Sequence, residues 1–113
     1  MGEGFPQPEA EESGETLKQR VIEALKAKGL EDPESIQIFT EWAKKQESQV
    51  ESAGSIEQSR EAQVRFEMAR ADIYNEANFK EEATIALEDA LTIATNEGNT
   101  SLQQEIEQKL NSL

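Results

Sequence analysis

The sequence NEANFKEEATIALEDALTIATNEG, residues 75–98, decides the fold. Within it, alanine recurs at spacings of three and four residues, at Ala83, Ala86, Ala90 and Ala94. That spacing puts the four methyl groups in a single row along a helix, and Gly98 is suited to end that helix. Because small side chains let two helix axes approach to about 8 Å, the row predicts that a helix over residues 79–97 packs closely against a neighbour.

The expected neighbour is the preceding helix, over residues 56–77, which is joined to the alanine row by a short turn. Ser55, with Gln58 three residues later, forms a capping box that predicts where this helix starts. Two opposite sides of it are apolar, one formed by Ala62, Phe66, Ala69, Ile73 and Ala77 and the other by Val64, Met68 and Ala71. We expect the first side to face the alanine row, with this helix as a middle element between two neighbours.

Three further helices complete the expected fold, over residues 15–28, 33–52 and 100–113. Gly29 is placed to stop the first, Asp32 and Pro33 to start the second, and Thr100 to cap the last. Along the second, the residues at helical spacing are Ile36, Phe39, Ala43 and Val50. Trp42 lies off this stripe, but we expect it in the core because a tryptophan buries a large apolar area. The prediction is an all-α fold of about five helices.

A single domain is expected over residues 15–113, preceded by a disordered acidic tail over residues 1–14. The tail contains two prolines and four acidic side chains but no basic one, so it buries too little to repay its ordering entropy. The chain start lacks the basic and apolar regions of a signal peptide, and no apolar run reaches the roughly 20 residues that cross a bilayer. We therefore expect a cytoplasmic protein with no membrane partner.

The composition argues against several classes of function. The 113 residues include 24 acidic and 11 basic side chains, for a formal net charge of −13, and neither cysteine nor histidine. Such a charge repels phosphate backbones, so direct nucleic-acid binding is not expected. The usual zinc ligands and the base of a Ser-His-Asp triad are missing. Adjacent acids such as Glu81 and Glu82 diverge by about 100° around a helix, so we expect no catalytic site, no metal site and no cofactor.

Part of the chain resembles a tetratricopeptide repeat (TPR). The residues that carry the resemblance are ADIYNEANF at 71–79, EEA at 81–83, Leu87 and the pair Ala90-Leu91. In the TPR pattern a small residue and an aromatic come late in helix A, and an alanine comes early in helix B; the matching offsets are those of Tyr74, Ala83, Leu87 and Ala90. Glu67 and Arg70 stand where the family has large apolar residues. The resemblance implies one partial repeat plus a capping helix at residues 64–113, within a short right-handed stack of antiparallel helix hairpins.

The inner surface of TPR proteins, built largely by helix A, binds extended or helical peptides. The resemblance implies such a surface here, formed by Arg65, Met68, Asp72, Asn75 and Glu76. Its acidic residues favour a partner with Lys or Arg beside apolar anchors, since opposite charge speeds encounter while apolar contact supplies burial. Ile85 is expected to be exposed on its own helix, either as a single surface residue or, with Ile38 or Trp42, as part of a contact patch.

We therefore expect a non-catalytic protein-protein interaction module, a small TPR-like adaptor or complex subunit that binds a basic or amphipathic peptide segment of a partner protein. The protein itself is expected to be a monomer or a weak homo-oligomer. An alternative from another class is an acidic inhibitor or DNA mimic that blocks a basic nucleic-acid-binding partner through its charge. Salt distinguishes the two, because a decoy loses binding at moderate ionic strength whereas a groove with apolar anchors keeps much of its affinity.

Overall fold

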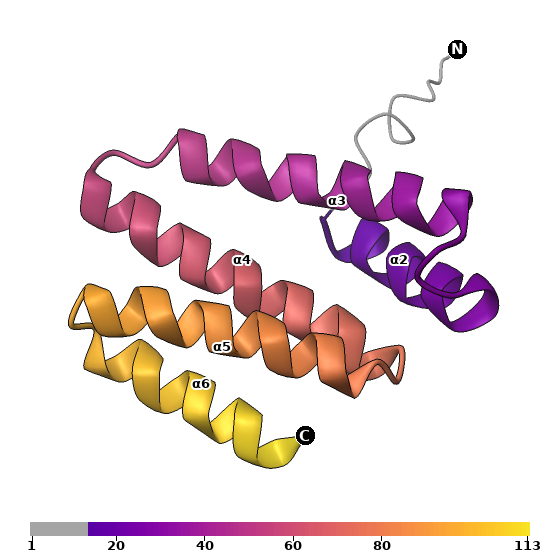
Figure 1. Ribbon diagram of the computed structural model, residues 1–113. Coiled ribbons are helices and arrows are strands. Elements are labelled where there is room, and N and C mark those ends of the chain that lie inside the picture. Colours follow the sequence, from indigo (N-terminus) through magenta and orange to yellow (C-terminus); the bar gives the residue numbers. More distant parts are fainter. Residues whose placement is uncertain (1–13) are drawn as a thin grey trace, which may run out of the picture.

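The computed structural model describes residues 14–113, which form five helices connected by short turns (Figure 1). They are α2 (Gly14–Lys28), α3 (Pro33–Glu51), α4 (Ile56–Glu76), α5 (Lys80–Asn96) and α6 (Thr100–Ser112). This confirms the predicted all-α fold, and every helix end lies within one residue of its expected position. The expected tail over residues 1–14 lies outside the described residues except for Gly14, with which α2 begins.

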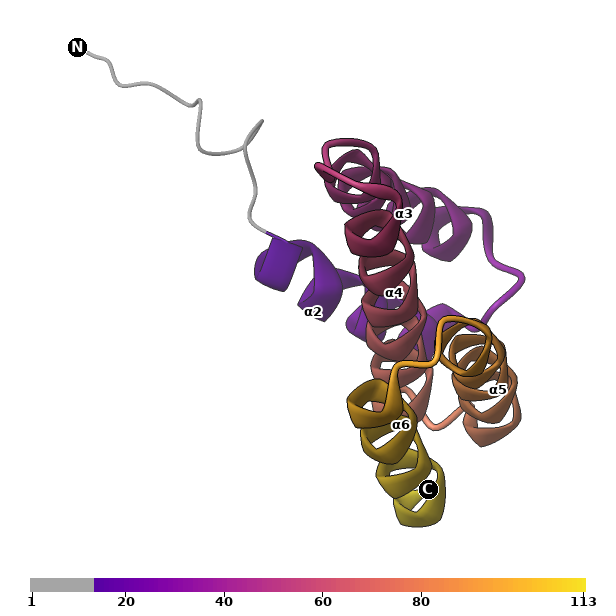
Figure 2. The ribbon, with the colours of Figure 1, turned by 90° about the vertical axis from the view of Figure 1, so that its left-hand side faces the viewer.

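The middle helix, α4, divides the described part of the chain into two packed halves. α2 and α3 pack on one side of it, while α5 packs on the other side and carries α6 (Figures 1 and 2). The contact between α4 and α5 is the most extensive of any helix pair in these residues. α4 is therefore the middle element that its two apolar sides predict.

Each half has its own apolar core. We call the first the α2–α4 core; its buried members are Leu17, Val21, Ile22, Leu25, Trp42, Ile73 and Ala77. We call the second the α4–α6 core; its buried members are Val64, Met68, Ala71, Ala83, Ala86, Leu87, Ala90, Ala94, Leu102 and Ile106. The four alanines of α5 are fully buried, as expected of a row at a close helix contact.

The alanine row meets a different side of α4 from the one expected. It packs with Val64, Met68 and Ala71, so the predicted contact with the Phe66 side is wrong. The physical reason is that α3 already covers that side, where the indole of Trp42 stacks on the ring of Phe66 with centroids 5.4 Å apart. Trp42 is only 1% exposed, which confirms its expected place in the core.

α3 is also turned about its axis relative to the expected stripe. Ile36 is 52% exposed, whereas the neighbouring Ser35 is fully buried. The Ser35 hydroxyl donates a hydrogen bond of 3.2 Å to the carbonyl oxygen of Ala24 in α2, which satisfies the buried polar group. Packing the large ring of Trp42 inward brings Ser35 to the α2 contact and leaves Ile36 at the edge of the core.

The turn between α4 and α5 depends on Asn78, whose φ of 71° is left-handed. The Asn78 amide donates to the Asn75 carbonyl at 3.0 Å, and the Phe79 amide donates to the Tyr74 carbonyl at 2.8 Å. These two bonds form a Schellman ending, and asparagine tolerates the left-handed backbone better than most residues. Phe79 and Tyr74 both pack at the edge of the α2–α4 core. The turn thereby fixes the direction in which α5 leaves α4.

The turn before α6 uses Gly98 in the same way, with a φ of 67°. The Asn99 amide donates to the Ala94 carbonyl at 2.9 Å, and the Asn99 side-chain oxygen accepts a hydrogen bond of 3.1 Å from the Leu102 amide. Asn99 is therefore the N-cap of α6, and the expected cap at Thr100 is wrong by one residue. Because Gly98 takes the left-handed position directly after α5, the next residue is the one that flanks the new helix.

Candidate functional site

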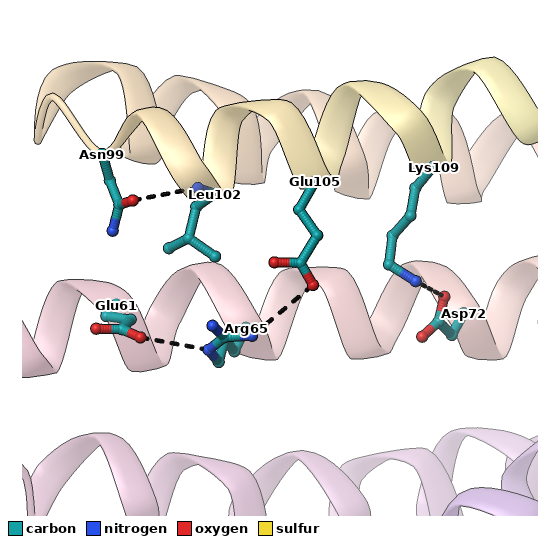
Figure 3. Close-up of polar contacts among 7 residues, drawn as sticks. All are labelled: Glu61, Arg65, Asp72, Asn99, Leu102, Glu105 and Lys109. Atoms are coloured by element: carbon teal, nitrogen blue, oxygen red, sulfur yellow. Dashed lines mark hydrogen bonds and ion pairs between the residues drawn. The ribbon is translucent and has the colours of Figure 1, made fainter.

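The five residues expected on a TPR-like inner surface lie on α4, where α4 faces α2 and α6. Figure 3 shows two of them bridged to α6: Arg65 lies 4.0 Å from Glu105, and the Lys109 ammonium donates to the Asp72 carboxylate at 3.0 Å. Arg65 also pairs with Glu61 within α4, at 3.4 Å. The pairs of Arg65 with Glu105 and of Asp72 with Lys109 therefore join α4 to α6.

The remaining three expected residues are placed differently from one another. Met68 is 5% exposed and belongs to the α4–α6 core, so its side chain contributes little to the surface. Asn75 is half-buried and, with Asp72 and Lys109, lines a cavity of about 390 Å³ between α4 and α6. Glu76 is exposed at the end of α4. The structure thus brings Asp72 and Asn75 together in one cavity, and a peptide-binding role for the five residues stays a prediction.

A second hollow on the molecule is lined by larger apolar side chains, three of them aromatic. It has a volume of about 300 Å³ and opens between α3 and α4, and we call it the α3–α4 depression. Its main apolar lining residues are Leu30, Ile36, Phe39, Ala43, Phe66 and Tyr74. The exposed Ile36 forms part of its rim. Large side chains from two helices therefore surround an opening that no other part of residues 14–113 fills.

The floor of the depression is a set of aromatic rings that hold one another in place. The centroid of Phe39 is 5.4 Å from that of Tyr74 and 5.8 Å from that of Trp42, with tilted and edge-on planes. Trp42 in turn stacks on Phe66 from within the core. Such offset and edge-to-face pairs favour fixed ring positions. The depression is thus a preformed apolar surface rather than one that a ligand would have to order.

One wall of the depression carries charge. The Arg70 guanidinium lies 2.8 Å from the Glu67 carboxylate and 3.8 Å from the Asp89 carboxylate of α5. It also lies over the ring of Tyr74, 5.9 Å from the centroid. Its Nε–H group is buried without a hydrogen-bond partner. Arg70 thus links α4 to α5 at the edge of an otherwise apolar surface.

Burial shapes the acid–base behaviour of this wall. It raises the pKa of the Glu67 carboxyl, an effect that Arg70 opposes and the nearby Asp89 carboxylate strengthens. It also raises the pKa of the Tyr74 hydroxyl, again opposed by Arg70 and strengthened by Glu82 and Glu67. The charged forms of both groups are disfavoured because burial removes the carboxyl and the hydroxyl from solvent.

Sequence reasoning did not identify the depression. It assigned Phe39 and Phe66 to core stripes, because periodicity cannot separate a buried ring from one that lines an opening. One signal pointed to the place: the charged Glu67 and Arg70 interrupt the resemblance to a TPR, whose pattern has large apolar residues at the matching offsets. Charged residues beside Phe66 and Tyr74 leave that wall incompletely covered by apolar neighbours.

Among residues 14–113, no group of three or more acidic, histidine or cysteine side chains is arranged to hold a metal ion. Within the same residues, no helix combines the length and the apolar character needed to cross a membrane. Comparison with protein-family models, with curated proteins and with solved structures finds no significant match to this chain.

Proposed function

We propose that this chain is a small, TPR-like interaction module without catalysis of its own, which binds a basic or amphipathic segment of another protein. The observation that carries the proposal is the preformed α3–α4 depression, an open apolar surface on a chain of net charge −13. Hairpin α4–α5 and helix α6 would correspond to one partial repeat and a capping helix, and α2 and α3 would form a divergent layer before them in a short right-handed stack.

Two physical effects favour binding of such a segment, namely apolar burial at the depression and attraction between opposite charges. Covering the rings of Phe39, Phe66 and Tyr74 removes apolar area from water, at about 25 cal/mol for each Å². Because these rings already contact one another, the protein loses little conformational freedom when the surface is covered. The acidic excess adds long-range attraction for Lys and Arg and works against self-association.

The proposal is tested with an aromatic-free peptide of lysine and leucine, about 18 residues long, whose leucines share one helical face. Trp42 is the only tryptophan and stacks on Phe66 of the depression, so its emission reports occupancy there. We expect a saturable change in Trp42 emission that persists at moderate salt. A peptide of the same composition with its leucines scattered around the helix is expected to bind weakly. Equal, weak responses to both peptides would refute the proposal.

Two isoleucines provide a matched pair of variants. Ile36 is 52% exposed and lines the depression, whereas Ile56 is 77% exposed in the first turn of α4 and does not line it. Because both side chains are mostly in water, neither Ile36→Ser nor Ile56→Ser is expected to affect folding much. We expect Ile36→Ser to weaken peptide binding and Ile56→Ser to leave it unchanged. Identical affinities for the two variants would place the peptide elsewhere.

A second candidate function is supported by the charge itself. With 24 acidic and 11 basic side chains, the chain could act as an acidic decoy that blocks a basic nucleic-acid-binding protein. For a decoy, the amphipathic and scattered peptides would bind alike, and binding would collapse between low and moderate ionic strength. The same titration therefore separates the two functions.

A further inference from the structure

We propose that α5, which lies beside the depression next to Arg70, recognises the partner, with Glu82, Ile85 and Asp89 as successive contacts for a helical segment that presents a basic, an apolar and a basic side chain in turn. This inference rests on the function proposed above and adds to it the recognition element and the chemical pattern of the partner.

One contact places this strip of α5 beside the depression. The carboxylate of Asp89 lies 3.8 Å from the guanidinium of Arg70, which lines the depression. Glu82 precedes Asp89 by two helical turns and so lies on the same side of α5, and its charge raises the pKa of the hydroxyl of Tyr74, another lining residue. The strip from Glu82 to Asp89 therefore runs beside the depression.

Ile85 lies between the two acids on the same surface. It follows Glu82 by three residues and precedes Asp89 by four, and residues at those spacings are neighbours on a helix. Its side chain is 55% exposed, and acidic residues flank it. On α3, the exposed Ile36 lines the depression itself. A partner helix with an apolar face would therefore find an aliphatic contact on α3 and another on α5.

The carboxylate of Asp89 has capacity for another cation. Its side chain is 59% exposed, and Arg70 lies closer to Glu67, at 2.8 Å, than to Asp89, at 3.8 Å. A partner lysine or arginine can therefore approach Asp89 from solvent while Arg70 keeps its closer pair with Glu67. The net charge of the chain favours a partner rich in lysine and arginine, and Asp89 is a defined place at which one of these side chains can bind.

The geometry also sets the spacing in the partner. Glu82 and Asp89 are seven residues apart, which is about 10 Å along a helix. A helix lying beside α5 would match them with two basic residues seven apart and an apolar residue three or four from each. Segments with basic residues at other spacings are expected to bind less tightly.

The test uses the lysine–leucine peptide with two of its lysines placed seven apart, and the readout is its affinity from Trp42 emission. For the Glu82→Lys/Asp89→Lys variant, we expect affinity to fall by about tenfold or more, because attraction becomes repulsion at both contacts. For Ile85→Ala we expect a loss of a few fold. A second peptide, with glutamates in place of those two lysines, is expected to recover affinity for the charge-reversed variant. A purely structural effect of the substitutions would not produce that recovery.

The matched control is Glu23→Lys/Glu107→Lys, which changes the net charge equally at exposed positions of α2 and α6. We expect it to bind within about twofold of the wild type, because only long-range attraction is reduced. Unchanged affinity in the Glu82→Lys/Asp89→Lys variant, or an equal loss in the control, would overturn the role of α5 while leaving the proposed function standing. Failure of the wild-type chain to bind either lysine-containing peptide would overturn both.

Discussion

Glu67 is the residue at which the depression departs most from an ordinary apolar surface. Its side chain is 19% exposed and lies 2.8 Å from the Arg70 guanidinium. An ion pair by itself lowers the pKa of a carboxyl, yet the pKa of Glu67 is raised, with burial as the largest cause. Removal from water therefore costs the charged carboxylate more than its pairing with Arg70 returns. The folded chain holds this charge at the expense of stability near neutral pH.

Substitution Glu67→Gln tests that balance because it removes the charge and keeps the shape. The folded state binds the Glu67 proton more tightly than the unfolded state, whose pKa is near the ordinary value of 4.5. The wild type therefore has its full stability relative to the variant at pH values below this ordinary pKa. It loses that relative stability as the pH rises through the raised pKa of Glu67. Urea titrations at a series of pH values measure the difference, and Glu107→Gln serves as the control for an exposed carboxyl. A difference that grows with pH would mean that the pairing with Arg70 outweighs burial.

Helix boundaries, in contrast to side-chain environments, follow from signals a few residues long. The Asp32 carboxylate accepts a hydrogen bond from the Glu34 amide at 2.9 Å, and the Ser55 hydroxyl accepts one from the Gln58 amide at 3.1 Å, as their cap positions predict. The rotation of a helix about its own axis has no such local signal. Neighbouring stripes on α3 and α4 are apolar enough to face inward, and the Trp42–Phe66 stack decides between them. Element positions were therefore predictable, but the contacts of α4 with its neighbours were not.

The alanine row leads to a prediction about α5 alone. Ala90 is 0% exposed in the α4–α6 core, whereas Ile85 is 55% exposed on the same helix. Ala90→Leu should force the larger side chain into the α4–α5 contact and cost about 1 to 3 kcal/mol in the free energy of unfolding. Ile85→Ala should cost well under 1 kcal/mol, because most of that side chain is already in water. Thermal unfolding followed by circular dichroism compares them, and equal melting temperatures would contradict the orientation of α5.

For the molecule as a whole, the sequence predicted the all-α fold and the extent of its five helices, but not the place of the opening. The depression forms where α3, α4 and the α2–α3 turn meet, so its lining comes from residues as far apart in sequence as Leu25 and Tyr74. Only the three-dimensional arrangement brings these side chains together. The α4 residues expected to bind a peptide were chosen by resemblance, and the structure pairs two of them, Arg65 and Asp72, with α6.

The division into two cores makes a prediction about how the molecule unfolds. Trp42 belongs to the α2–α4 core, and Ile106 is fully buried in the α4–α6 core at the other end of the stack. Ile106→Ala is expected to cost about 2 to 5 kcal/mol. In a stack whose helices contact mainly their neighbours, that loss should fall on α5 and α6 first. In a urea titration we expect part of the helical signal to be lost before the emission of Trp42 changes.

The matched control for this experiment is Val21→Ala, since Val21 is 0% exposed in the α2–α4 core. There the order should reverse or the two signals should coincide, because the damage lies beside Trp42 itself. Both helices of the α4–α5 hairpin contribute to the α4–α6 core, and α4 contributes to the other core as well. If α4 couples the two cores strongly, the destabilisation caused by Ile106→Ala reaches the α2–α4 core through Ile73 and Ala77. Both halves would then unfold together. Coincident transitions in Ile106→Ala would therefore show that α4 couples the two cores more strongly than α6 is coupled to α5.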